Sequence, residues 1–407
     1  MYVNVAVLAE THAHERRVAL VPGVVAKLVK LGARLHMQSG AGAAIHLDDS
    51  AYTDVVFMSD RRALLKDADV VLAVGAPALD AIDAMKAGAI LISFIYAGKD
   101  PHVVEHLLER RITCFAMERV PRISRAQAMD ALSSQSALAG YYAVQLGATH
   151  LARVIPKITS AAGSIGPAKV LVMGLGVAGL EAMATAHRLG AMVEGYDIRP
   201  DTREQALSLG GTFVDTGVDA TGKGGYARAL TDTEKTKVAS VLTAHIQQAD
   251  LVITTAAIPG KASPKLISHE QVAGMKAGSV IVDLSAEGGG NCVDTEPGKT
   301  VSVGRVTIVA PLNVPSMLGE DASELYAKNV FNLLALMLKD NIITIDWSDA
   351  VLAGTVLTHG GENKARAHDK AEAAKPAPAD PPGVGHKHPD AAKPAAGTAA
   401  PPTPAAA

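Results

Sequence analysis

The stretch Lys169-Val-Leu-Val-Met-Gly-Leu-Gly-Val-Ala-Gly179 decides the fold of the central part of this chain. Its first half is a short apolar run that predicts a buried strand, and its glycines have the spacing Gly174-x-Gly176-x-x-Gly179. Gly174 permits a tight turn, Gly176 lets the backbone approach a pyrophosphate, and Gly179 lets a helix pack closely on the strand. The spacing therefore predicts a dinucleotide-binding turn.

The residues after the turn complete a βαβ unit. A helical pattern runs from Val177 to about Leu189, and a second apolar run, 191–196, ends at Asp197, which lies 18 residues beyond Gly179. The helix N-terminus offers unpaired N–H groups and a positive dipole end to phosphates. A carboxylate at about this spacing accepts hydrogen bonds from the adenosine ribose, which favours NAD over NADP. Nearby Arg199 and Arg203 weaken that preference.

Composition sets the class of protein. A chain of 407 residues predicts two or three domains, and 48% hydrophobic residues with 3% aromatic residues predict cores built from aliphatic side chains. The net charge of −3 gives no basic face for nucleic acid. Cys114 and Cys292 are expected to be buried, reduced thiols. We see no signal peptide and no apolar run of the length of about 18 residues that spans a bilayer, so we expect a soluble, cytoplasmic chain.

The pattern of strands and helices predicts the fold class, an α/β chain with two Rossmann-like parallel-sheet domains, joined by long helices and separated by a cleft. In the first 120 residues, strands are expected at 3–8, 34–38, 70–74, 90–95 and 112–117, with helices at 24–31, 78–86 and 101–110. In the second unit, which runs to about residue 311, further strands are expected at 251–255, 280–284 and 306–310, with a helix at 268–275. Long helices are expected at 126–150 and 321–339, and a mobile loop at 215–226.

These elements predict three parts of the chain. Residues 1–125 and 320–360 form a discontinuous N-terminal Rossmann-like domain, and residues 126–319 form the NAD(H)-binding domain with its bridging helix. Residues 361–407 are rich in Ala and Pro and form a disordered tail. Two histidines in this tail, His386 and His388, have the residue type of metal ligands, but we interpret them as solvated residues of a linker, and we predict no metal site.

Two polar clusters lie outside the glycine turn. Ser124 and Gln127 match a capping box at the start of the predicted long helix. That structural interpretation leaves Arg122, Asp130 and Ser133 without an explanation, so a functional role for them stays open. In the loop after the first strand, Glu15-Arg16-Arg17 is either a surface charge cluster or a fork that binds a carboxylate or phosphate.

Several motifs together resemble a known family. They are Val120–Ser134, Ala139–Tyr141, Ala161–Gly163, the glycine turn, Thr254–Lys261, Met275–Leu284 and Gly288–Cys292. Over about residues 1–360 the chain resembles the alanine dehydrogenase/transhydrogenase family. Within it, the chain is similar to the NAD(H)-binding α subunit (domain I) of proton-translocating NAD(P) transhydrogenase.

The resemblance implies roles for particular residues. Four residues match the loop at the nicotinamide end of NAD(H), where Gln127 places the ring and the others orient or support it: Gln127, Arg122, Asp130 and Ser133. The implied cofactor-binding residues include the tip of a loop that closes over the nucleotide, Gly225-Tyr226. The full set is Gly174, Gly176, Val177, Ala178, Gly179, Asp197, Ile198, Arg199, Gly225, Tyr226, Thr255 and Ala256.

The resemblance also separates the two branches of the family. Alanine dehydrogenases carry an Arg, a Lys and a His around the keto acid, and the matching positions here are Arg17, Ala73 and Tyr96. The chain also departs from the family at Leu8-Ala9. Without an acid or base, the expected acceptor of the hydride is a second nicotinamide, which needs proximity, alignment and exclusion of water. A stand-alone alanine-dehydrogenase-like enzyme and a non-enzymatic NAD-binding module remain as alternatives.

The implied function is direct hydride transfer between NAD(H) on this chain and NADP(H) on a partner β subunit, coupled to proton translocation. A second partner is a membrane-spanning subunit that conducts protons. The chain itself is expected to form a homodimer and to lie peripherally on the inner face of the bacterial plasma membrane.

Overall fold

The computed structural model describes residues 2–199, 201–219, 230–257 and 262–365. Several sequence-based predictions therefore lie outside the described residues. They are the nucleotide-closing tip Gly225-Tyr226, the end of the Thr254–Lys261 motif, and residues 366–407 of the predicted tail, with His386 and His388.

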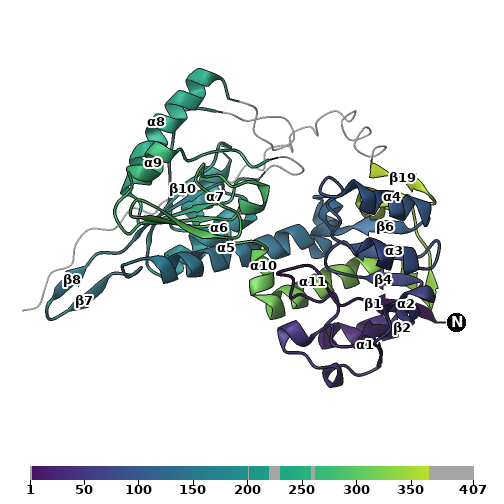
Figure 1. The fold of residues 1–407 in the computed structure, drawn as a ribbon. Helices are drawn as coiled ribbons and strands as arrows, with labels where there is room; N and C mark the ends of the chain where they lie inside the picture. The colour runs from purple at the N-terminus through teal and green to yellow at the C-terminus, as the bar shows by residue number, and fades with distance from the viewer. Residues whose placement is uncertain (1, 200, 220–229, 258–261, 366–407) are drawn as a thin grey trace, which may run out of the picture. The chain divides into compact units, whose positions relative to one another are not determined.

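Among the described residues, the first sheet has eight strands in the order β19-β18-β6-β5-β4-β1-β2-β3 (Figure 1). β3, β2, β1, β4, β5 and β6 pair in parallel, and β18 pairs antiparallel to both β6 and β19. The strands are β1 (Val3–Val7), β2 (Ala33–Gln38), β3 (Val55–Met58), β4 (Val70–Leu72), β5 (Ile90–Ser93), β6 (Thr113–Ala116), β18 (Val356–His359) and β19 (Glu362–Asn363). Sequence analysis missed β3 and placed 362–363 in the tail, whereas these two residues form an edge strand.

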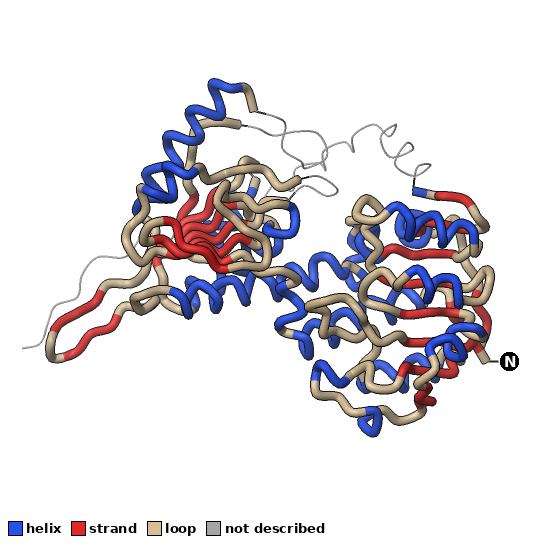
Figure 2. The backbone as a smooth tube through the Cα atoms, in the orientation of Figure 1, coloured by secondary structure: helices blue, strands red, loops and turns tan. Residues whose placement is uncertain are grey.

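Both faces of the first sheet are covered, which explains why its strands are apolar on both sides. Alternate residues of β1 point to opposite faces, so Val5 packs in one core and Ala6 in the other. Figure 2 shows the helices around the strands. The helices of this region are α1 (Pro22–Lys30), α2 (Arg61–Lys66), α3 (Leu79–Ala84), α4 (Pro101–Glu109) and α12 (Ala350–Thr355), with short 3₁₀ turns η1 (Ala43–Ile45), η2 (Asp49–Ala51) and η3 (Met117–Arg119).

The six parallel strands of the second sheet repeat the order of those in the first, and its antiparallel edge differs. Its order is β11-β10-β9-β12-β13-β15-β14, parallel except for β14, and its two faces pack in separate apolar cores. Its strands are β9 (Lys169–Met173), β10 (Met192–Tyr196), β11 (Thr212–Phe213), β12 (Leu251–Thr254), β13 (Val280–Asp283), β14 (Thr300–Val303) and β15 (Val306–Val309). Its helices are α6 (Val177–Arg188), α7 (Thr202–Ser208), α8 (Asp232–Gln248) and α9 (His269–Ala273), with η6 (Ala286–Gly288). The predicted fold class, two Rossmann-like parallel sheets in an α/β chain, is confirmed.

The two long helices differ from their predicted bounds. α5 (Ala131–His150) starts five residues later than predicted, because Ser124–Met129 forms a 3₁₀ helix, η4, instead. α11 (Gly319–Leu334) ends before the predicted limit, and Leu338–Lys339 forms β16 in a hairpin with β17 (Ile342–Ile343). A short helix, α10 (Val314–Met317), precedes α11. Figure 1 shows α5 beside α10 and α11.

Helix α11 follows the second sheet in the chain but packs among elements of the first. Ser323 Oγ accepts a hydrogen bond from Val18 N at 3.0 Å, and Tyr326 Oη donates one to Ala73 O at 2.8 Å. Both side chains are fully buried. From these contacts we propose that residues 320–360 belong with residues 1–125 to the N-terminal domain, and that residues 126–319 form the NAD(H)-binding domain.

Within the described ranges, no helix is long and apolar enough to cross a membrane. A separate hairpin, β7 (Ile158–Ser160) and β8 (Gly163–Ile165), is exposed along both strands. Sequence analysis did not predict it. The two cysteines are free and fully buried, as predicted.

Candidate functional site

The glycine turn has the geometry that a dinucleotide needs. Gly174 has φ +96°, which L-residues with a side chain rarely adopt. A Cβ on Gly179 would lie 1.8 Å from Gly174 O, so only glycine allows α6 to pack this closely on the turn. A Cβ on Gly176 would meet no atom within 4 Å, which leaves open space in front of the N-terminus of α6. The turn therefore fits a pyrophosphate group held by backbone N–H groups.

The residues around this turn form a hollow at the start of α6. Val177 is 44% exposed, and Ala178 packs against Gly140 of α5, where a Cβ would lie 2.1 Å from Ala178 O. The lining residues of the hollow are Leu175, Gly176, Val177, Leu180, Arg199, Asp201, Thr202 and Gln205. Predicted cofactor-binding positions from the turn and from the end of β10 are thus brought together at one end of the second sheet.

Asp197 lies at the end of β10 and already holds hydrogen bonds from the protein. Its Oδ2 accepts from Leu175 N at 2.7 Å, and its Oδ1 accepts from Arg199 N at 2.9 Å. The Arg199 guanidinium also pairs with both carboxylate oxygens, at 3.0 Å and 2.9 Å. Asp197 therefore fixes the glycine turn, and its carboxylate oxygens can also accept hydrogen bonds from a ligand. The positive charge of Arg199 partly neutralises this carboxylate. Ile198, between them, is half-buried.

The end of β12 closes the other side of the turn. Thr255 Oγ1 donates to Gly174 O at 2.8 Å. Ala256 is held at both its backbone groups by Asn291, whose Oδ1 accepts from Ala256 N at 3.0 Å and whose Nδ2 donates to Ala256 O at 2.8 Å. Asp283, which is fully buried, accepts from Asn291 N at 2.7 Å. The role of Asn291 was not predicted from the sequence, because its partner lies 35 residues away in the chain.

In the loop with the four predicted nicotinamide-end residues, the predicted capping box at Ser124 is wrong. Ser124 does not cap a helix, since the N-cap of η4 is Ile123 and no side chain accepts there. Asp130 is the N-cap of α5, and its carboxylate accepts from Ser133 N at 2.9 Å and from Ser133 Oγ at 2.6 Å. Capping therefore explains Asp130 and Ser133, two of the three residues that the predicted capping box left without an explanation, and does not explain Gln127.

Gln127 and Arg122 are both exposed. Gln127 lies between two buried anchors of the same 3₁₀ helix, Ala126 and Met129. The loop therefore presents its amide side chain outward from a fixed backbone.

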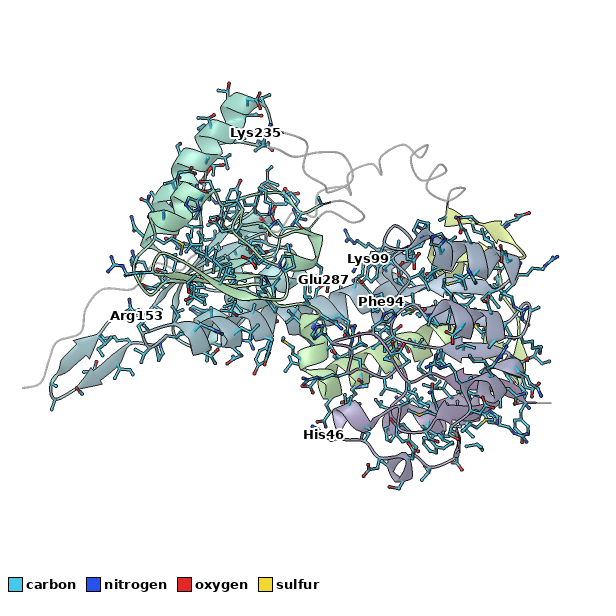
Figure 3. All side chains as sticks on the ribbon, viewed as in Figure 1. His46, Phe94, Lys99, Arg153, Lys235 and Glu287 are labelled. Atoms are coloured by element: carbon cyan, nitrogen blue, oxygen red, sulfur yellow. The ribbon has the colours of Figure 1, made fainter. Side chains whose placement is uncertain are left out.

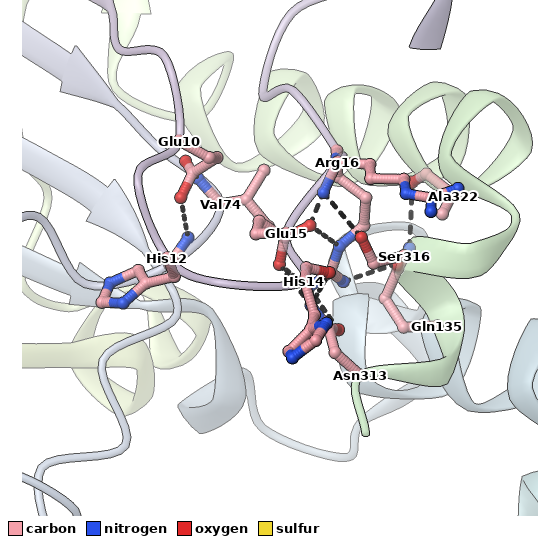
Figure 4. A network of polar contacts seen from close by, with 12 residues as sticks. Glu10, His12, His14, Glu15, Arg16, Val74, Gln135, Asn313, Ser316 and Ala322 are labelled. Atoms are coloured by element: carbon pink, nitrogen blue, oxygen red, sulfur yellow. Dashed lines mark hydrogen bonds and ion pairs between the residues drawn. The ribbon is translucent and has the colours of Figure 1, made fainter. Parts of the chain in front are cut away.

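Arg17 is neither a surface residue nor a free anion-binding fork. It is 8% exposed and pairs with Glu15 through Nε–Oε1 at 2.8 Å and Nη2–Oε2 at 2.6 Å. Gln135 Oε1 and Asn313 Oδ1 accept its remaining hydrogen bonds, at 2.8 Å and 3.2 Å (Figure 4). Burial raises the pKa of Glu15, but its hydrogen bonds with Arg17 and the charge of Arg17 outweigh this and hold the pKa below its usual value.

The ends of β1 and β4 are joined by Glu10. Its carboxylate accepts from Val74 N at 2.6 Å and from Gly75 N at 3.2 Å (Figure 4). Burial, reinforced by the charge of Glu15, raises the pKa of Glu10 to about 7, while its backbone hydrogen bonds act in the opposite direction. The same region contains Ala73, which is 2% exposed and has no titratable side chain.

Tyr96 stands where the resemblance places the histidine of alanine dehydrogenases. It has φ +48°, and its ring stacks on Phe94 with centroids 5.5 Å apart. Tyr96 is protonated at neutral pH at the ordinary pKa of a phenol, and desolvation and the charge of Glu118 raise its pKa further. Nearby, Lys99 and Glu287 form an exposed ion pair at 2.8 Å (Figure 3). Within the described residues, no group of three or more His, Cys, Asp or Glu has the arrangement of a metal site.

Comparison with models of protein families shows to which family the chain belongs. The model of the alanine dehydrogenase/PNT N-terminal domain matches residues 6–139, and that of the alanine dehydrogenase/PNT C-terminal domain matches residues 143–365. The chain belongs to the alanine dehydrogenase/PNT family. The predicted resemblance is thus confirmed.

Individual members of the alanine dehydrogenase/PNT family extend this result. An NAD(P) transhydrogenase subunit alpha of Rhodospirillum rubrum, named as the first part of that subunit, is 44% identical over 372 residues, which cover 88% of this chain and 97% of that protein. The crystal structure of transhydrogenase from Sinorhizobium meliloti has a TM-score of 0.78 at 38% identity, covering 88% and 98% of the two chains. An L-alanine dehydrogenase structure has a TM-score of 0.74 at 22% identity, covering 91% and 99%, and shows the shared fold. Most of the chain is therefore homologous to a transhydrogenase α subunit.

Proposed function

We propose that this chain is the NAD(H)-binding subunit of a proton-translocating transhydrogenase. NADH bound at the second sheet supplies a hydride, which passes directly to NADP⁺ held by a partner β subunit. The observation that carries the proposal is the open glycine turn of the second sheet, in a chain whose first sheet has Ala73 and Tyr96 in place of a substrate Lys and His. The Rhodospirillum rubrum relative supports it, because its name, the first part of subunit alpha, implies further subunits.

In this proposal, the residues of the chain bind and orient the nucleotide. The backbone at Gly174, Gly176 and Gly179, with Val177 and Ala178 at the start of α6, receives the pyrophosphate. Asp197, Ile198 and Arg199 lie at the adenosine ribose, and Thr255 and Ala256 border the opposite side. Arg122 and Gln127 face the nicotinamide end, while Asp130 and Ser133 hold the start of α5. We also propose that Gly225 and Tyr226 contact the nucleotide.

Transfer between two nicotinamides needs no protein acid or base, because a hydride moves and no proton is exchanged. It needs the two rings close together, aligned and shielded from water. A stand-alone alanine dehydrogenase needs a group that exchanges a proton with the substrate. At the position of the family's lysine Ala73 has no such group, and at the position of its histidine the phenol of Tyr96 stays protonated at neutral pH and cannot accept a proton from alanine.

The test combines this chain with a recombinant NADP(H)-binding subunit of a transhydrogenase. We expect hydride transfer from NADPH to an NAD⁺ analogue only when both proteins are present, and no reduction of NAD⁺ by alanine. Gln127→Ala should lower the transfer rate at least tenfold while NADH still binds. Ser124→Ala, an exposed change on the same 3₁₀ helix, is the matched control and should leave the rate unchanged. Alanine-dependent reduction without a partner would establish the alternative enzyme instead.

We further propose a homodimer that binds a membrane-spanning, proton-conducting subunit at the inner face of the bacterial plasma membrane. The β7–β8 hairpin supports the dimer. Its cross-strand pair Ile158 and Ile165 is 42% and 54% exposed, and a two-stranded hairpin has little stability alone. Ile165→Lys should convert the dimer into a monomer in analytical ultracentrifugation, and an unchanged dimer would show that the hairpin is not the interface.

A further inference from the structure

One backbone carbonyl of the nicotinamide-end loop is held by two side chains of α11. Asn329 Nδ2 and Asn332 Nδ2 each donate to Ala128 O at 2.9 Å. Residues three positions apart lie on the same face of a helix, so both amides reach one point. A carbonyl oxygen has two lone pairs, and here both are used by the same helix.

The two asparagines differ in their surroundings. Asn329 is 7% exposed, and its Oδ1 accepts from Ser134 Oγ at 2.8 Å, which ties the start of α5 to the same point. Asn332 is half-exposed and reaches Ala128 from the solvent side of the helix. The loop is also held from α12, because Arg125 makes a two-pronged ion pair with Asp349, the N-cap of that helix.

These contacts surround the backbone of Ala128, the residue that follows Gln127. Ala126 and Met129 are buried on either side, whereas Gln127 and Ala128 are exposed. The Gln127 side chain is oriented by the two peptide planes that flank its own Cα, and the second of these planes ends at Ala128. The carbonyl that α11 holds belongs to the next plane, between Ala128 and Met129, so the two hydrogen bonds act on Gln127 by fixing the backbone at Ala128.

We propose that Asn329 and Asn332 are positioning residues for hydride transfer. They fix the backbone at Ala128 so that Gln127 meets the nicotinamide end of the bound nucleotide. This inference rests on the proposed function and on the place of Gln127 in it. Small misplacements of an aligning group reduce the rate of a reaction far more than they reduce ligand affinity, because only the rate depends on the near-attack geometry. Neither asparagine has to touch the nucleotide.

The experiment measures single-turnover hydride transfer to the recombinant NADP(H)-binding subunit at saturating nucleotide, together with NADH affinity. Asn332→Leu keeps the side-chain size and removes the donor, and because Asn332 is half-exposed the variant should fold. We expect the transfer rate to fall about tenfold, with NADH affinity within about twofold of the wild type. Asn329→Leu should lower the rate further if it folds. Lys328→Leu, on the same helix and paired with Glu324, is the control and should transfer at the wild-type rate.

A double-mutant cycle separates positioning from a general structural effect. If Asn332 acts through Gln127, Asn332→Leu should change the rate less than about twofold in a Gln127→Ala background. Equal losses in both backgrounds, or wild-type transfer by Asn332→Leu, would overturn the inference while leaving the proposed function intact. If the wild-type pair transfers no hydride, the proposed function fails and the inference falls with it.

Discussion

The six parallel strands of each sheet have the same order, but the ends of the central strands differ between the sheets, since side chains fill this space in the first sheet and leave it open in the second. In open α/β sheets, ligands bind where the strand order reverses, which is beside β1 and β4 in the first sheet and beside β9 and β12 in the second. In the first sheet, Glu10 lies on the backbone N–H groups of Val74 and Gly75. In the second, the space in front of Gly176 is open.

This difference separates fold from function. Both sheets have the topology that binds nucleotides. In the first sheet, the polar groups at the strand ends form hydrogen bonds and ion pairs with one another. Its Arg17, the residue type that would hold a substrate carboxylate, gives four of its five guanidinium N–H groups to Glu15, Gln135 and Asn313. The second sheet leaves backbone donors at a helix N-terminus for a ligand. The residues that follow the strands, and not the strand order, therefore decide which sheet carries a site.

The largest expected effect tests whether the Arg17 network is structural. Arg17→Met removes one partner of a buried ion pair and leaves the Glu15 carboxylate, whose side chain is 6% exposed, without its cation. We expect the free energy of unfolding to fall by about 3 kcal/mol, measured by urea denaturation, with NADH affinity unchanged.

Arg16→Met is the control for this comparison. Arg16 is adjacent but exposed, so we expect a change within about 0.5 kcal/mol. If Arg17→Met kept its stability and lost NADH, Arg17 would belong to the nucleotide site and the contrast between the sheets would be wrong.

The next effect concerns the pH dependence of the group that fills the first sheet. The pKa of Glu10 is raised by burial from 4.5 to about 7 in the folded chain. The folded state therefore binds more protons than the unfolded state between these values, and the stability of the chain falls as pH rises through this window. Glu10→Gln is neutral throughout, so it should be more stable than the wild type by up to about 3 kcal/mol at about pH 8, with the gain lost at the acid end of the window.

The measurement is the urea midpoint at several pH values. Glu109→Gln, an exposed change on α4, should shift the midpoint equally little at every pH. If Glu10→Gln were less stable than the wild type at the alkaline end, the prediction would be wrong. The hydrogen bonds from Val74 N and Gly75 N would then stabilise the charged carboxylate by more than its burial costs.

Local patterns made the second sheet predictable. The glycine spacing, the helix after it and Asp197 all follow from a short segment in which each residue has a local role. The first sheet was predictable as strands and helices but not as a site. Two of the three partners of Arg17, Gln135 and Asn313, lie 118 and 296 positions away in the chain, and no local pattern connects them with Arg17.

The start of α5 shows a different limit. Two segments in succession have capping chemistry, Ser124 with Gln127 and Asp130 with Ser133. The pattern alone does not choose between them. Tertiary contacts decide, because Asn329 and Asn332 hold Ala128 in the 3₁₀ turn between the two and delay the helix until Ala131.

A smaller effect should follow from closing the open turn. Gly176→Ala adds a Cβ that meets no atom within 4 Å, so the chain should keep its stability. The methyl group would occupy space needed by the pyrophosphate, and we expect the Kd for NADH to rise about tenfold. Gly23→Ala, at an equally open and exposed helix start beside the first sheet, should leave the Kd unchanged. An unchanged Kd for Gly176→Ala would remove this glycine from the nucleotide site.

The smallest effect concerns the choice of nucleotide. Arg199 covers the carboxylate of Asp197 and so weakens its repulsion of a 2′-phosphate. Arg199→Ala should therefore weaken NADPH binding by about threefold to tenfold and change NADH binding less, measured by nucleotide fluorescence. Arg203→Ala breaks an exposed pair with Asp215 and is the matched control. If Arg199→Ala weakened NADH as strongly as NADPH, Arg199 would contact the part that the two nucleotides share, and selection between them would rest on Asp197 alone.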